Sequence, residues 1–277
     1  MAPEDFRFLA RLLRRRSGLL LGSDKRALTR SRLAQVMRRF GFKDEASLIQ
    51  DLRLGRESLV EAVVEAMTIQ ESAFFREPAQ FAALRSHVLP RLLEARQSDK
   101  TGEKILRVWS AAAAAGQEAY SIAMILSDLS LAQNGWRLDI VATDIAADAI
   151  ARAERGRYSA HEIERTPELE ALSPWLSRDG MEWVVADSLR RMVRFRRFNL
   201  LDSFGWLDDL DLVFCRNVLM YFDPAGRGDV LDRIADTLAP HGMLFLGEHE
   251  VADRGFEASG EGPGIYARKG FALSRTA

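Results

Sequence analysis

The stretch Val108-Trp-Ser-Ala-Ala-Ala-Ala-Ala-Gly-Gln-Glu-Ala-Tyr-Ser121 decides the fold of this chain. It joins a β-rich run, Ile105–Trp109, to a helical segment, Glu118–Ser130, through small residues and a single glycine, Gly116. Such a turn lets a ligand approach the backbone and sets the free N–H groups of a helix start beside it. Plain packing of alanines before a helix accounts for the same residues without a ligand, and both interpretations stay open here.

Strands and helices continue to alternate toward the C-terminus. The further β-rich runs are Leu138–Thr143, Leu212–Cys215 and Met243–Gly247, and the further helical segments are Ala147–Glu154 and Gly228–Leu238. This alternation predicts a parallel sheet with helices on both faces, and such sheets bind ligands beyond the carboxyl ends of their strands. Residues 157–198 break the pattern. The run Met192–Phe198 partly alternates apolar and basic residues, so we expect a small antiparallel insert there.

The first part of the chain is predicted to be helical. Between Lys25 and Phe40 the apolar residues recur at the spacing of one buried helix face; they are Leu33, Val36, Met37 and Phe40. Asp24 is expected to cap this helix and Gly41 to end it. Off the apolar stripe lie Arg26, Arg30, Arg32 and Arg39, which predicts a basic outer face. A second helix is expected at Leu59–Met67.

Composition excludes several classes of protein. The 277 residues are 47% apolar, which suits a globular protein with a real core, and no apolar run is long enough to span a bilayer. The first residues lack the pattern of a secretory signal. The one cysteine, Cys215, has no disulfide partner, and no Cys/His set has zinc-ligand spacing. We therefore expect a cytoplasmic protein without a metal, in which Cys215 is a small core residue.

The charge is distributed unevenly along the chain. Residues 1–43 carry twelve Lys/Arg and three Asp/Glu, whereas the remaining residues carry a net charge of −10. A basic arm of this kind suits an anionic partner, but a solvated basic helix face accounts equally well for the charge alone.

Polar residues follow the predicted strands where ligands bind. Asp144 comes directly after Leu138–Thr143 and is placed either to accept hydrogen bonds from ribose hydroxyls or to cap the next helix. Arg216 and Asn217 follow the strand Leu212–Cys215. The loop before Gly116 has no phosphate-loop motif, so an adenosine-type ligand without phosphates, such as S-adenosylmethionine, fits these positions.

Together these segments resemble the CheR methyltransferases, in order and spacing over about residues 5–270. The matching pieces are Met67-Thr-Ile-Gln-Glu-Ser-Ala-Phe-Phe-Arg-Glu-Pro78, Val108-Trp-Ser110, Gly116-Gln-Glu-Ala-Tyr-Ser121, Ala142-Thr-Asp-Ile145, Phe198-Asn-Leu-Leu201, Phe214-Cys-Arg-Asn-Val218 and Tyr221-Phe-Asp223. The resemblance implies an N-terminal helical domain at residues 1–75. It also implies a Rossmann-like class I methyltransferase domain at residues 76–277, with a β-subdomain inserted at about 157–198.

The resemblance also implies an activity and its site. The methyl group of S-adenosylmethionine is expected to pass to glutamate γ-carboxylates on cytoplasmic chemoreceptor helices, leaving S-adenosylhomocysteine. By motif, the cofactor contacts fall on Gln70, Ser72, Arg76, Glu118, Asp144, Asn199, Leu200, Arg216 and Asn217. Arg76 and Tyr221 are expected nearest the reacting centre, with an interdomain salt bridge as the alternative role for Arg76. No metal, nucleic acid or membrane insertion is implied.

Departures from the family pattern bear on affinity and docking. Gln70 and Ser72 stand where Asn and Thr are usual, and the cofactor loop has alanines where hydroxyls are common. The segment Ser177–Trp183 is short, so tight binding of a receptor's tether pentapeptide is not expected. Three rival functions remain at this stage: a methyltransferase for small molecules or RNA, a sensing adaptor without catalysis, and a DNA-binding module at residues 1–43.

Overall fold

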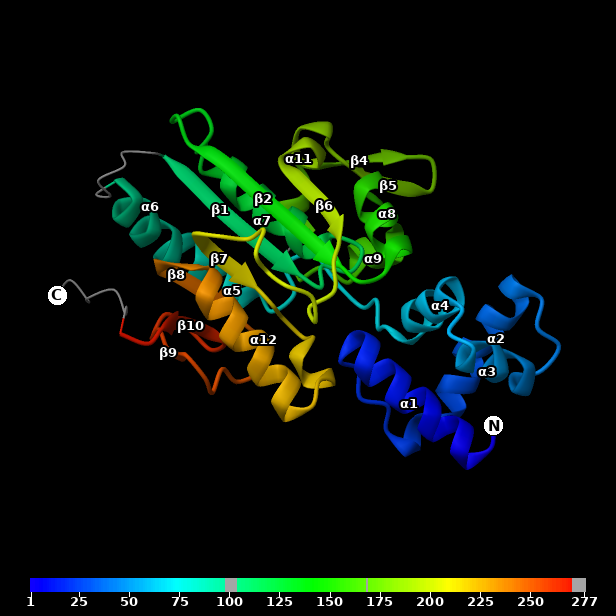
Figure 1. Ribbon diagram of the computed structural model, residues 1–277. Helices are drawn as coiled ribbons and strands as arrows, with labels where there is room; N and C mark the ends of the chain where they lie inside the picture. The colour runs from blue at the N-terminus through cyan, green and yellow to red at the C-terminus, as the bar shows by residue number, and fades with distance from the viewer. Residues whose placement is uncertain (98–103, 168, 271–277) are drawn as a thin grey trace.

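A helical bundle and a larger sheet-based part make up the chain (Figure 1). The computed structural model describes residues 1–97, 104–167 and 169–270. The bundle consists of α1 (Pro3–Ser17), a 3-10 turn (Ser23–Lys25), α2 (Arg26–Phe40), α3 (Glu45–Arg53) and α4 (Glu57–Met67). Their apolar faces meet in a separate core that includes fully buried Leu9, Leu13, Leu33, Leu48 and Leu59. The two predicted helices correspond to α2 and α4.

The larger part is built on a seven-stranded sheet in the order β6-β2-β1-β7-β8-β10-β9. Its elements up to the insert are α5 (Pro78–Ala83), a π-helical turn (Leu84–Val88), α6 (Leu89–Gln97), β1 (Ile105–Ala111), α7 (Gln117–Asp128), β2 (Arg137–Asp144) and α8 (Ala147–Arg155). After the insert come α11 (Asp187–Met192), β6 (Val193–Arg197), β7 (Leu210–Phe214), a 3-10 turn (Leu219–Tyr221), α12 (Pro224–Thr237), β8 (Leu238–Phe245), β9 (Phe256–Ala258) and β10 (Ile265–Arg268). The strands from β6 to β8 pair in parallel, and β10 and β9 add two antiparallel pairings. The expected Rossmann-like architecture is confirmed.

Successive residues of β1 explain why this strand is mostly apolar. Leu106 and Val108 lie in the core that α6 and α7 share, whereas Trp109 and Ala111 lie in the core on the face of α12. Because side chains alternate across a strand, a sheet with helices on both faces requires apolar residues at nearly every position.

The strand order reverses beside β1, with β2 on one side and β7 on the other. Ligands of open α/β sheets bind in the crevice at such a switch point, beyond the carboxyl ends of the strands. Figure 1 shows the helical bundle lying at this end of the sheet, so any crevice there has the bundle as its second wall.

The insert is a small antiparallel sheet, but it is shorter than expected. It contains β3 (Arg157–Ser159), α9 (Ala160–Glu164), α10 (Leu169–Leu172), β4 (Leu176–Asp179) and β5 (Glu182–Val185), with strand order β3-β5-β4. The assignment of Met192–Phe198 to this insert is wrong, because β6 pairs in parallel with β2. As an edge strand, β6 buries Val193 and exposes Arg194, so it alternates as a half-solvated antiparallel strand does.

Of the two predicted ends of α2, the C-terminal one is confirmed and the N-terminal cap is not. Gly41 ends the helix in the left-handed conformation, with φ of 75°, and its N–H bonds the carbonyl of Met37. The expected cap by Asp24 is wrong, because Asp24 lies in the preceding 3-10 turn and Lys25 precedes the helix without a side-chain cap. Within the described residues, no helix combines the length and apolar character needed to cross a membrane.

Candidate functional site

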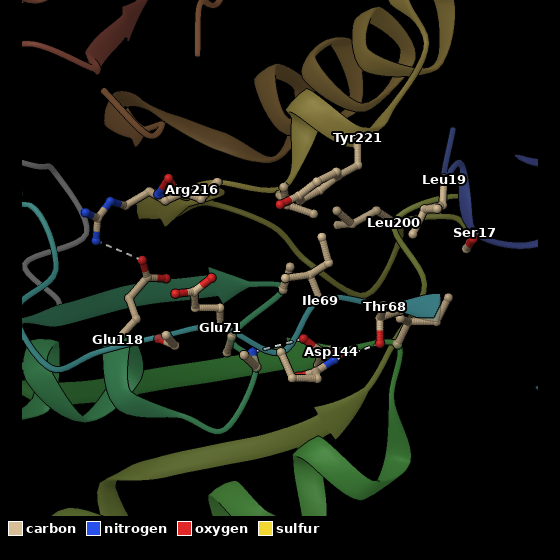
Figure 2. A pocket seen from close by; sticks show the side chains of 18 of the residues that line it. Ser17, Leu19, Thr68, Ile69, Glu71, Glu118, Asp144, Leu200, Arg216 and Tyr221 are labelled. Atoms are coloured by element: carbon tan, nitrogen blue, oxygen red, sulfur yellow. Dashed lines mark hydrogen bonds and ion pairs between the residues drawn. The ribbon is translucent and has the colours of Figure 1, made fainter. Parts of the chain in front are cut away.

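A pocket lies between the helical bundle and the carboxyl ends of the central strands (Figure 2). The strand ends supply Ala112–Ala114 beyond β1, Asp144 and Ile145 at β2, Phe198–Leu200 beyond β6 and Arg216–Val218 beyond β7. The opposite wall comes from Ser17, Leu19, the segment 68–73, Arg76, Tyr221 and Phe222. Glu118 of α7 completes the lining. Every residue that the family resemblance assigned to the cofactor or to the reacting centre therefore lines this one pocket, although its part in binding or catalysis stays a prediction.

Asp144 is the buried carboxylate at the centre of the pocket. Its Oδ1 accepts hydrogen bonds from the backbone N–H of Ala146 at 2.9 Å and from the Gln70 amide at 3.4 Å, and its Oδ2 accepts the N–H of Ala114 at 2.9 Å. An ionised carboxylate has about four acceptor sites, so one remains for a ligand hydroxyl. Burial raises the pKa of Asp144, while the bonds from the two backbone N–H groups oppose that rise.

The alanine loop places small side chains and strained backbone against the pocket. Ala112 and Ala114 have φ values of 54° and 48°, which residues other than glycine rarely adopt. Gly116 does not line the pocket. A Cβ at this position, where φ is 91°, would lie 2.8 Å from Cβ of Ala153. The expectation that Gly116 admits a ligand is therefore wrong, because this glycine lets α7 pack closely against α8.

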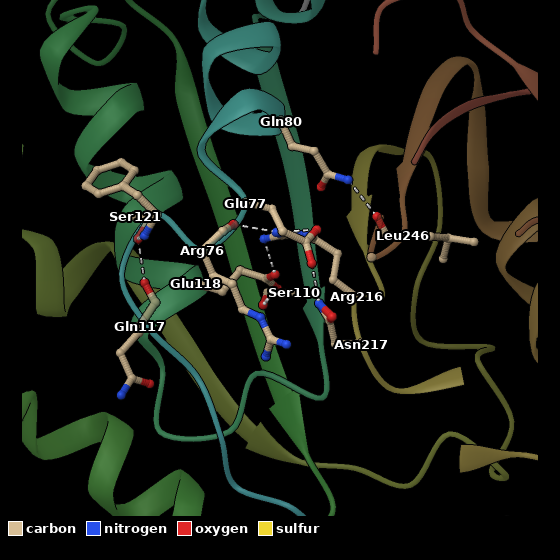
Figure 3. A network of polar contacts seen from close by, with 12 residues as sticks. Arg76, Glu77, Gln80, Ser110, Gln117, Glu118, Ser121, Arg216, Asn217 and Leu246 are labelled. Carbon is tan, nitrogen blue, oxygen red and sulfur yellow. Dashed lines mark hydrogen bonds and ion pairs between the residues drawn. The ribbon is translucent and has the colours of Figure 1, made fainter. Parts of the chain in front are cut away.

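Arg216 is the hub of a buried ionic network (Figure 3). Its guanidinium pairs with Glu118 at 3.0 Å and with Glu77 at 2.9 Å, and it also donates to the carbonyl of Arg76. Ser110 donates to the second oxygen of Glu118 at 2.7 Å. Burial raises the pKa of Glu118, and the charge of Arg216 opposes the rise. Protein groups thus occupy most of the Arg216 donors, but its Nε is buried without a hydrogen-bond partner among the described residues.

Two carboxylates shape the loop that follows β7. Asn217 has φ of 58°, and its side-chain amide donates to Glu77 at 3.0 Å. Glu250 accepts the backbone N–H groups of Asn217, Met220 and Gly247 at 2.6, 3.0 and 2.9 Å. These bonds set the course of the loop that leads to Tyr221.

The polar atoms of the Asn199 side chain are hydrogen-bonded to protein groups. Its amide donates to the carbonyl of Arg16 at 2.7 Å, at the end of α1, and its oxygen accepts the N–H of Leu201 at 3.0 Å. Asn199 and its neighbour Leu200 can therefore meet a ligand mainly through backbone and apolar atoms. Ser72 lines the pocket, half-buried, on the facing segment.

Arg76 and Tyr221 keep their functional groups available. Arg76 donates to the carbonyl of Glu71 at 3.3 Å, and within the described part of the chain it forms no ion pair, so the alternative role in an interdomain salt bridge is wrong. The carbonyl of Tyr221 accepts a hydrogen bond from the N–H of Leu20 at 2.8 Å, which joins the bundle to the 3-10 turn after β7. No described residue hydrogen-bonds the Tyr221 hydroxyl.

Sequence reasoning missed Glu77, Glu250 and Glu71. Glu77 lies inside the Met67–Pro78 motif, but the family resemblance assigned it no role. Glu250 follows the end of β8, the same edge of the sheet that pointed to Asp144, so the strand-end rule was enough to find it. Glu71 lies in the same motif as Glu77 and was likewise given no role; it lines the pocket and pairs with Arg165 at 2.8 Å.

Comparison with known families defines the class of this protein, a methyltransferase built on a Rossmann-like sheet. Two family models match, "CheR methyltransferase, all-alpha domain" at residues 4–68 and "CheR methyltransferase, SAM binding domain" at residues 70–259. The chain belongs to the CheR methyltransferase family, and it is an enzyme that uses S-adenosylmethionine.

Named relatives agree with this assignment. The chain is 39% identical to chemotaxis protein methyltransferase 1 of Pseudomonas aeruginosa, over 90% of this chain and 91% of that protein. It is 38% identical to a chemotaxis protein methyltransferase of Pseudomonas putida, over 89% and 90%. A relative in Salmonella typhimurium is 34% identical, over 90% and 84%. Among the described residues no cluster of His, Cys, Asp and Glu is suited to hold a metal ion.

The Glu77–Arg216 pair predicts a difference between two nearby carboxylates. Glu77→Gln leaves buried Arg216, whose side chain is 2% exposed, with Glu118 as its one charged partner. We expect the free energy of unfolding to fall by about 3 kcal/mol in urea denaturation. Glu71→Gln, which removes an exposed partner of Arg165, is the control and is expected to cost less than about 1 kcal/mol. Equal effects of the two changes would count against the network.

Acidification is predicted to weaken cofactor binding. Burial raises the pKa of both Glu118 and Asp144, so each gains a proton at a higher pH than an exposed acid does. Protonation removes hydrogen-bond acceptors, and we expect the Kd of S-adenosylmethionine in calorimetry to be flat above neutrality and to rise below it. Because burial makes the pKa of each group higher in the folded protein than in the unfolded chain, protonation of these two groups stabilises the fold as pH falls. Unfolding caused by these groups therefore does not explain the expected loss of cofactor binding. Asp144→Asn should flatten the profile; an unchanged Kd down to about pH 5 contradicts the prediction.

Proposed function

We propose that the enzyme methylates glutamate γ-carboxylates on cytoplasmic helices of chemoreceptors, forming glutamate methyl esters and S-adenosylhomocysteine. The observation that carries the proposal is the pair Arg76 and Tyr221. Both line the cofactor pocket, Arg76 without an ion pair and Tyr221 without a hydroxyl partner in the described ranges. A cation and a hydroxyl suit an incoming carboxylate. The chemotaxis relatives and the family match support the same substrate class.

The residues present fit S-adenosylmethionine. Asp144 retains acceptor capacity for a ribose hydroxyl, and the methyl groups of Ala112–Ala114 leave room beside the strand ends. The unpartnered Nε of Arg216 suits a carboxylate such as that of the methionine moiety. We propose that Gln70, Ser72 and Glu118 complete the polar contacts, with Asn199, Leu200 and Asn217 adding backbone and apolar ones. When bound, the cofactor supplies a methyl group on a sulfonium, an activated leaving group.

The reaction asks mainly for positioning. A glutamate with an ordinary pKa of about 4.3 is ionised at neutral pH, so the chain needs no general base. Arg76 orients the entering carboxylate, and Tyr221 donates a hydrogen bond or walls the path of the methyl group. Holding the reacting atoms in line accounts for most of the rate. The reaction neutralises charge in the transition state, and a dry site favours that loss of charge.

The basic bundle suits an acidic receptor surface, but not all its arginines are free. Arg30 pairs with Glu45 at 3.0 Å. Arg32 donates to the carbonyl of Met67 at 2.7 Å and satisfies the end of α4, so the expectation that it belongs to the basic outer face is wrong. Lys25 and Arg26 are exposed and form no ion pair within the described residues. We propose that such unpaired cations steer acidic helices toward the pocket.

The β-subdomain is proposed not to bind a receptor's tether pentapeptide tightly. β4 and β5 join through Gly180 and Met181 alone, with Gly180 at φ of 63°, so the hairpin lacks a longer loop for a peptide to dock on. Calorimetry with such a pentapeptide is expected to give no heat at micromolar concentrations. Micromolar affinity would refute this part of the proposal.

The proposed substrate places the enzyme in the cytoplasm, where the receptor helices lie, with no nucleic-acid partner and no insertion into the membrane. The test of the proposal is peptide mass spectrometry after incubation of the protein with S-adenosylmethionine and receptor-containing membranes. We expect receptor glutamates to gain the mass of one methylene. Modification confined to other residues, to RNA or to small molecules would contradict it, and cofactor binding without any transfer would favour the adaptor.

A further inference from the structure

One side chain of the antiparallel insert reaches the back of the cofactor pocket. Tyr158 belongs to β3, the first strand of the insert, and its hydroxyl donates to the carbonyl of Ala115 at 2.6 Å. Ala115 directly follows Ala112–Ala114, the part of the loop after β1 that lines the pocket, but neither Ala115 nor Tyr158 is in the lining. Tyr158 therefore contacts the wall of the pocket from behind.

The hydrogen bond between Tyr158 and Ala115 is buried, and no other bond replaces it. Tyr158 is completely buried, and burial raises the pKa of its phenol, so the hydroxyl keeps its proton and acts as the donor. Among the described residues, no other group donates to the carbonyl of Ala115. Because a buried carbonyl without a partner is costly, loss of the Tyr158 hydroxyl favours a different course of the loop.

The loop after β1 needs restraints from its surroundings. Ala112 and Ala114 have left-handed φ values of 54° and 48°, and non-glycine residues keep such values only where the structure around them holds them in place. The N–H of Ala114 donates to Asp144 at 2.9 Å, which fixes the middle of the loop to β2. No group of β2 bonds the carbonyl of Ala115, so at this end of the loop the restraint comes from Tyr158.

The ring of Tyr158 also contacts the facing wall of the pocket. It packs edge-on against the ring of Phe74, with the ring centres 5.0 Å apart. Phe74 is completely buried and directly follows the segment 68–73, which lines the pocket opposite the strand ends. One side chain of the insert therefore contacts both the loop after β1 and the segment that faces it. Phenylalanine at position 158 keeps the ring contact and removes only the hydroxyl.

We infer that Tyr158 is a positioning residue for S-adenosylmethionine, whose hydroxyl holds the loop after β1 in the conformation that the cofactor needs. The inference rests on the proposed placement of the cofactor in this pocket. Tyr158 acts through Ala115 on the neighbouring Ala114 and does not touch the cofactor. The insert thus contributes to cofactor binding, although none of its described residues between 157 and 185 lines the pocket.

A relaxed loop lowers the affinity for the cofactor by population alone. If only about one molecule in ten keeps the loop in the binding conformation, the apparent Kd rises about tenfold. A tenfold change corresponds to about 1.4 kcal/mol, which is the size expected for one lost buried hydrogen bond.

Two buried tyrosines provide a matched test. Tyr120 on α7 is also completely buried, and its hydroxyl donates to the carbonyl of Ala153 on α8 at 2.7 Å. Tyr158→Phe and Tyr120→Phe therefore each delete one hydroxyl and one buried bond to a backbone carbonyl. We expect both variants to lower the midpoint of urea denaturation by similar amounts. In calorimetry, Tyr158→Phe should raise the Kd of S-adenosylmethionine about tenfold, and Tyr120→Phe less than twofold.

Amide hydrogen exchange without cofactor measures the loop itself. Tyr158→Phe is expected to speed exchange at the N–H groups of Ala113, Ala114 and Gly116 about tenfold, whereas Tyr120→Phe leaves it unchanged. Equal Kd values for the two variants, or unchanged exchange at these amides in Tyr158→Phe, overturn the inference.

Asp144→Asn separates this inference from the placement of the cofactor. If Asp144→Asn raises the Kd while Tyr158→Phe binds as tightly as Tyr120→Phe, the positioning role of Tyr158 is wrong and the pocket still holds the cofactor. If neither Asp144→Asn nor Tyr158→Phe raises the Kd, the placement of the cofactor and the role of Tyr158 are both wrong.

Discussion

Arg76→Ala is expected to lower kcat on receptor glutamates by about two to three orders of magnitude. Its guanidinium is a pocket cation without an ion pair in the described residues, and misplacing a reacting carboxylate by about 1 Å costs about a hundredfold. The Kd of S-adenosylmethionine should rise much less, because Asp144 and Arg216 remain. Steady-state kinetics together with calorimetry separate the two effects.

Arg85→Ala is the matched control for this result. Arg85 lies nine residues further along the chain, exposed and paired with Asp128 at 3.0 Å, away from the pocket. It should leave kcat unchanged. Arg76→Lys should recover part of the activity, because an ammonium keeps the charge but not the fork of donors. A kcat within twofold of wild type for Arg76→Ala rules out the proposed role of Arg76.

Asp144→Asn is expected to weaken S-adenosylmethionine binding by about a hundredfold. An asparagine has one acceptor oxygen, whereas the carboxylate accepts from Ala114, Ala146 and Gln70 at once. The asparagine NH2 group can only donate, so it faces one of these N–H groups without forming a hydrogen bond. A buried hydrogen bond that is not formed costs about 1–3 kcal/mol, in addition to any lost contact with the ligand. Isothermal titration gives the Kd directly.

The same strand provides a control for Asp144. Asp139→Asn changes an Asp five residues earlier on β2 that pairs with Arg194 outside the pocket. Its cofactor Kd is expected to match wild type. If the Asp144→Asn variant binds as tightly as the Asp139→Asn variant, Asp144 does not hold the cofactor.

The positions of the site residues follow from the sequence because parallel strands end at one edge. Asp144 and Arg216 lie at the carboxyl ends of β2 and β7, and strand order alone brings them to one crevice. Asn199 was expected there from the family motif only, because the run before it was assigned to the antiparallel insert. The partners of these side chains do not follow in this way. Arg216 pairs with Glu77, 139 residues away, and Asn199 bonds Arg16, 183 residues away. No local pattern encodes such pairings.

The errors in the fold have a similar origin. An edge strand of a parallel sheet and an antiparallel strand both alternate, so β6 was placed in the insert. Gly116 was assigned to ligand approach because the packing of α7 on α8, which fills the space beside it, is a tertiary contact. The domain boundary at residues 75 and 76 stays a proposal, and the predicted end of the second domain at residue 277 lies outside the described residues.

Release of methanol by base tests the central claim most directly. Receptor-containing membranes are incubated with the protein and methyl-labelled S-adenosylmethionine, and the washed membranes are then treated with alkali. Because a glutamate methyl ester hydrolyses in base, we expect volatile label from wild type and from the Arg85→Ala variant, and almost none from Arg76→Ala. Label that stays on the membranes after alkali, or none transferred at all, would contradict glutamate methylation as the function of this enzyme.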